Sequence, residues 1–136
     1  MIYFAWPDSE CIAGEPLLLK WSRYTALIFA VGLGIGEAVI NWGHWQFAPL
    51  WIVDYVIVVW LVAGFYKTRS GHGIAVLISG WAFTAGVFYM ALFISLDPEL
   101  KHYINPSPTI LALMAIMLGF ATLGILTAAL SYRKQG

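Results

Sequence analysis

The chain has 136 residues, of which 61% are hydrophobic and only 10% are charged. Soluble globular domains carry about 25% charged residues, so this composition excludes an ordinary soluble domain and indicates a protein that lies mostly in lipid. Seven basic residues balance seven acidic ones, and they form no basic stripe, which excludes a nucleic-acid-binding surface. Cys11 is the only cysteine, which excludes an internal disulfide and a thiolate zinc site.

Residues 1–16 differ from the rest of the chain because their apolar run stops at Trp6 and acidic residues follow. They have neither the basic start nor the long apolar core of a signal peptide. We therefore expect a retained arm that lies at the membrane interface or in the cytoplasm.

Four apolar blocks follow, at residues 17–41, 48–66, 73–95 and 108–131. Each is long enough to cross a bilayer as a helix, which takes about 20 residues. None shows the alternation of a lipid-facing barrel strand. The sequence predicts an all-α integral membrane protein: one domain over residues 17–132, built as an antiparallel bundle of four transmembrane helices, with a tail at 133–136.

The basic residues predict how the chain is oriented, because lysine and arginine favour the cytoplasmic side. Only Lys101 falls on one side of the predicted membrane. The other six fall on the opposite side: Lys20, Arg23, Lys67, Arg69, Arg133 and Lys134. Both termini are thus expected in the cytoplasm, and the loops 42–47 and 96–107 outside. The compact chain and the lack of targeting signals predict the plasma membrane of a bacterium.

Small residues recur at the four-residue spacing that lets membrane helices approach closely. The predicted helix-packing positions are Gly32 with Gly36, Ala82 with Gly86, and Ala115 with Gly119. Ala30 and Gly34 form an adjoining track in the first span, and Gly124 with Ala128 repeats the spacing in the fourth. Trp81, near the middle of the third span, is expected to pack in the core.

Several polar residues interrupt the apolar sequence at the end of the first span. Glu37, Asn41 and His44 fall at helical spacing on one face. Asp54 lies in the second span, nine residues after Trp45, and Glu37 lies eight residues before Trp45, so the two carboxylates are expected at similar depth. That depth is about 8 to 10 Å below the outer helix ends.

These residues admit two interpretations. Ionised side chains in lipid normally face a bundle interior or a water-filled cavity, and two carboxylates without a nearby cation can share a proton or bind a cation. In this interpretation Glu37, Asp54, His44 and Asn41 form a proton or cation site. Alternatively, each acid only fastens helices through hydrogen bonds.

A metal site is a weaker alternative, with Glu37, His44, Asp54 and His102 as its candidate ligands. The spacing adds no support, since the chain has no HxxxH pair. No cofactor is predicted.

Three functions remain open. The first is a small transporter or channel subunit that forms a homo-oligomer. The second is an accessory subunit of a larger respiratory or photosynthetic membrane complex. The third is a membrane enzyme that acts on a lipid or quinone, with His44 and the carboxylates in acid–base roles; the chain contains no catalytic motif that favours it.

Overall fold

A computed structural model describes residues 16–43, 48–70, 72–100 and 106–133. These ranges contain α1 (Leu17–Ile40), α2 (Ala48–Arg69), α3 (Ile74–Leu96) and α4 (Pro108–Arg133), and no strand. Each helix is long and apolar enough to span a membrane. The predicted all-α fold with four candidate transmembrane helices is therefore confirmed, whereas the orientation of the termini stays a prediction.

The helix boundaries follow local chemistry. The hydroxyl of Ser107 accepts a hydrogen bond from the backbone N–H of Ile110, at 3.4 Å, directly before Pro108 begins α4. The end of α2 lies at Arg69, beyond the predicted apolar block that ends at Tyr66. The turn that follows requires glycine, because Gly73 has a φ of 138° and a Cβ there would lie 2.5 Å from the Cβ of Lys67.

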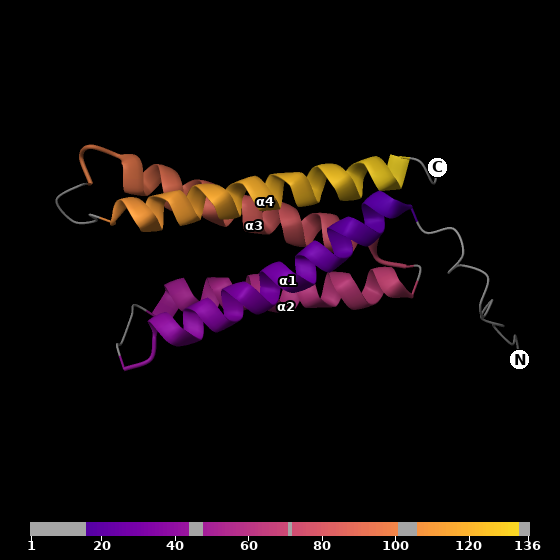
Figure 1. Cartoon of the computed structure of the whole chain (residues 1–136), viewed down its shortest axis with the longest axis horizontal. Coiled ribbons are helices and arrows are strands. Elements are labelled where there is room, and N and C mark those ends of the chain that lie inside the picture. Colours follow the sequence, from indigo (N-terminus) through magenta and orange to yellow (C-terminus); the bar gives the residue numbers. More distant parts are fainter. Residues whose placement is uncertain (1–15, 44–47, 71, 101–105, 134–136) are drawn as a thin grey trace, which may run out of the picture.

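Successive helices alternate in direction, so that α1 with α2 and α3 with α4 form two hairpins (Figure 1). α1 also packs on α4, and α2 also packs on α3. We define the basic end of the bundle as the end at which α1 and α3 begin and α2 and α4 end. It carries all the described lysines and arginines: Lys20, Arg23, Lys67, Arg69 and Arg133.

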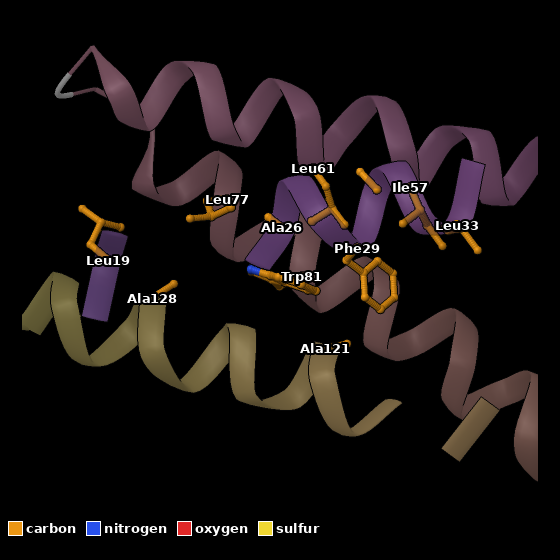
Figure 2. Close-up of a cluster of buried hydrophobic side chains, with 11 residues drawn as sticks. Leu19, Ala26, Phe29, Leu33, Ile57, Leu61, Leu77, Trp81, Ala121 and Ala128 are labelled. Carbon is orange, nitrogen blue, oxygen red and sulfur yellow. The ribbon is translucent and has the colours of Figure 1, made fainter. Parts of the chain in front are cut away.

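Most of the buried core lies toward the basic end of the bundle. Burial of apolar side chains in α1 ends at Leu33, and in the described part of α2 it begins at Ile57. In α4, Ala121 and Ala128 are fully buried, whereas Ile110, on the same helix face, is 45% exposed. The two hairpins accordingly diverge toward the opposite end (Figure 1). Figure 2 shows the core itself, with Trp81 pointing between α1 and α4.

Trp81 joins three of the four helices. Its ring is fully buried and lies directly on Gly124 of α4, where any Cβ would clash with it. Its Nε1–H donates to the hydroxyl of Ser22 in α1, at 3.1 Å, and that hydroxyl donates to the carbonyl of Gly124, at 3.0 Å. Phe29 meets the ring edge-on, with centroids 5.4 Å apart. The expected core position of Trp81 is confirmed.

The six predicted helix-packing residues face away from the rest of the chain. Gly36 is half-buried and the other five are exposed: Gly32, Ala82, Gly86, Ala115 and Gly119. A Cβ on any of the four glycines would meet no atom within 4 Å. Within one chain, therefore, these residues do not hold helices together, and their contact with other molecules stays a prediction.

The small residues that do pack inside the bundle lie on the same helices, two positions away from the predicted helix-packing residues. Ala30 and Ala121 are fully buried, and a Cβ added at Gly34 would lie 3.7 Å from the Cγ2 of Val58. Two positions correspond to about 200° around an α-helix, so neighbouring small-residue tracks point in nearly opposite directions.

The seat of Trp81 on Gly124 predicts how two glycines of α4 will respond to substitution. Gly124→Val places a side chain into the indole ring, and overpacking of this kind costs about 1–3 kcal/mol. Gly119→Val adds the same side chain where a Cβ meets nothing within 4 Å. Thermal unfolding of the purified protein in detergent should show a clear fall in the midpoint for Gly124→Val alone. Equal midpoints for the two variants would contradict the packing described here.

Candidate functional site

Glu37 and Asp54 meet across the first hairpin. Glu37 lies in the last turn of α1 and Asp54 in the second turn of α2, and both side chains are half-buried. Their carboxyl groups are close enough to interact electrostatically across the hairpin. The structure therefore brings together the two carboxylates that the sequence placed at equal depth.

Asn41 completes the described part of this cluster. Its Nδ2 donates to the carbonyl of Glu37, at 2.8 Å, and to the Oε2 of the same residue, at 2.9 Å. Because both partners are acceptors, the amide nitrogen must face Glu37 and the Oδ1 must point away. That Oδ1 is buried and accepts no hydrogen bond from the described residues. The cluster thus holds two carboxyl groups and one amide oxygen that can accept another donor or a cation.

The charges of the described residues are separated along the bundle. All four carboxylates lie in the half away from the basic end, at Glu37, Asp54, Asp97 and Glu99, whereas the lysines and arginines lie at the basic end. No described cation is therefore at the level of the Glu37 and Asp54 pair. Two carboxyl groups in contact can form a hydrogen bond only when they share a proton, and a bound cation is the alternative way to neutralise them.

Two predicted site residues, His44 and His102, lie outside the described residues. The described part of the chain contains no group of three or more histidines, cysteines and acids placed to hold a metal ion. The metal hypothesis, and the enzyme hypothesis that relied on His44, therefore stay predictions.

Arg23 is the residue whose surroundings the sequence analysis missed. Among the sequence predictions Arg23 serves only as a marker of orientation, yet it is only 7% exposed, and its guanidinium lies 5.6 Å from the centre of the Phe65 ring in α2. The signal was present in the spacing. Arg23 follows Leu19 by four residues and precedes Ala26 and Ala30 by three and seven, which places it on the buried face of α1.

Comparison with known proteins finds no family model, no curated protein and no solved structure that matches this chain. The functional argument therefore rests on the geometry of the chain itself.

Proposed function

We propose that this chain is a subunit of a small membrane transporter or channel, in which Glu37 and Asp54 bind a proton or a cation. The observation that carries the proposal is the placement of two half-buried carboxyl groups on the packed helices α1 and α2, near enough to interact. Carboxylates in an apolar helix are costly, and where they occur they commonly mark ion or proton pathways.

The local chemistry suits a positively charged occupant. The pair lies far from every described lysine and arginine, so no fixed cation of the described chain neutralises it. Asn41 adds a buried Oδ1 that accepts nothing from the described residues. Oxygen atoms of carboxylates and amides are the ligands that hard cations prefer, and the same oxygens accept the donors of a protonated solute.

The position of the pair favours a path formed by more than one subunit. Four helices enclose little volume, and most of their buried core lies nearer the basic end than Glu37 and Asp54 do. The half that holds Glu37 and Asp54 is the half in which the hairpins diverge (Figure 1). In a symmetric homo-oligomer, the open half of each chain faces its neighbours or a shared path. With the basic end in the cytoplasm of a bacterium, the pair would lie in the outer half of the plasma membrane.

Reconstituted liposomes provide the test of this site. Glu37→Gln and Asp54→Asn keep the size and hydrogen-bonding capacity of each side chain but remove the charge that binds a proton or cation. Proton-linked flux, followed with a pH-sensitive dye under an imposed gradient, should fall in each variant to the level of protein-free liposomes. Glu99→Gln is the matched control, since Glu99 is an exposed carboxylate after α3, and its flux should equal that of the wild type.

The alternative role of the pair as a structural fastener predicts a different pattern. In that case both variants would carry flux like the wild type and differ only in thermal stability. Unchanged flux in Glu37→Gln and in Asp54→Asn would therefore overturn the proposed site.

A second candidate function is an accessory subunit of a larger membrane complex. The outward direction of Gly32, Gly36, Gly86 and Gly119 favours it, because glycines with open space beside them let a partner helix approach closely. In this arrangement the same surfaces that are empty in the single chain would be covered by other proteins.

Native gels separate the two candidates. After gentle detergent extraction from its own membrane, an accessory subunit should migrate in an assembly larger than any homo-oligomer, and Gly36→Leu should release it from that assembly. Val31→Leu, at an exposed position elsewhere on α1, should leave it in place. Recovery of the wild type only as a free homo-oligomer would rule out the accessory role.

A further inference from the structure

A groove runs along the outer face of α2. It has a volume of about 540 Å³ and includes among its lining residues Trp51, Tyr55, Val59, Trp60 and Lys67 of α2, with Val76 of α3; we call it the α2 groove. Sites for small molecules occupy about 300–1,000 Å³, so the groove is large enough for a ligand. Neither Glu37 nor Asp54 lines it, which separates it from the carboxyl site.

One wall of the groove is fixed by contacts with α3. The Nε1–H of Trp60 donates to the hydroxyl of Ser79, at 3.2 Å, and that hydroxyl donates to the carbonyl of Val76, at 3.0 Å. The Trp60 ring also stacks on Phe83, with centroids 5.4 Å apart. The wall is thus held in place before any ligand binds, which lowers the entropy lost on binding.

The length of the groove suits an extended apolar chain. Lys67 lies near one end, and Tyr55 lies 12 residues before it on the same helix, which corresponds to about 18 Å. One leaflet of a bilayer provides about 15 Å of hydrocarbon. An acyl chain that starts at the level of Lys67 can therefore follow the groove through its leaflet as far as Tyr55.

The positive charge at one end of the α2 groove favours a lipid with an anionic headgroup. Lys67 is exposed and lies at the basic end, whereas every described carboxylate lies in the other half of the bundle. Arg69 lies in the same turn but does not line the groove, so Lys67 is the basic residue of the α2 groove. Basic residues at a membrane surface attract anionic lipid headgroups.

The same charge disfavours a second copy of the chain as the occupant. Two copies in one membrane are related by an axis along the bilayer normal, so equivalent residues lie at equal depth. A copy that packs its own α2 groove on this one would bring its Lys67 close to the first, and like charges across an interface are unfavourable.

We propose that the α2 groove binds one anionic phospholipid, whose acyl chain lies along Val59 and Trp60 and whose phosphate contacts Lys67. This site is independent of the function proposed for Glu37 and Asp54.

Native mass spectrometry of the full chain in lipid-retaining detergent tests the proposal. The probes are phosphatidylglycerol and phosphatidylcholine with identical acyl chains. The wild type should retain one phosphatidylglycerol in preference to phosphatidylcholine, and Lys67→Gln should lower this preference about fivefold, which corresponds to about 1 kcal/mol for one basic residue at the surface. Val59→Trp should displace the lipid by filling the groove, because Val59 is 68% exposed and tolerates a larger side chain.

Matched controls exist for both variants. Lys20→Gln removes an exposed lysine from the basic end but outside the groove, and Val31→Trp enlarges a half-exposed valine on α1; both should bind lipid like the wild type. Equal retention of the two lipids by the wild type would overturn the proposal, as would an equal effect of Lys20→Gln and Lys67→Gln. Loss of self-association in Val59→Trp, with lipid binding unchanged, would assign the groove to a second copy and also overturn it.

Discussion

The bundle depends on the packing of Trp81 against Gly124 and Ser22, because α1, α3 and α4 meet at this point. In lipid, helices gain little from the hydrophobic effect, and close packing with a few hydrogen bonds must hold them together. A hydrogen bond between membrane helices contributes about 0.6 kcal/mol on average. The two bonds at Ser22 are therefore modest in energy, and the fit of the indole ring over a residue without a side chain determines the arrangement.

The contacts of Trp81 lie toward the basic end of the bundle. Side chains toward the opposite end are more exposed. Ala121 is fully buried, whereas Leu113, two turns earlier in α4, is 54% exposed. The Glu37 and Asp54 pair lies in the open half. Within the described residues, the chain thus separates a more closely packed, apolar part from the part that holds the carboxylates.

Sequence reasoning succeeded where one quantity decided the outcome. The length of the apolar blocks located the four helices, and the equal distance of Glu37 and Asp54 from the turn predicted their approach. It could not choose between equivalent patterns: Gly32 with Gly36 and Ala30 with Gly34 have the same spacing, and within the chain only the second track packs against other helices. The burial of Arg23 was missed because a rule for membrane orientation was given more weight than helical periodicity.

The central claim is that Glu37 and Asp54 act as one unit that holds a proton or exchanges it for a cation. Infrared difference spectroscopy in lipid across a pH titration tests this directly, because the carbonyl stretch of a protonated carboxyl group is distinct from that of a carboxylate. We predict a protonated carboxyl band in the wild type that shifts or disappears both in Asp54→Asn and in Glu37→Gln, since each variant alters the partner of the remaining acid. Two independent bands, each unaffected by substitution of the other residue, would contradict it.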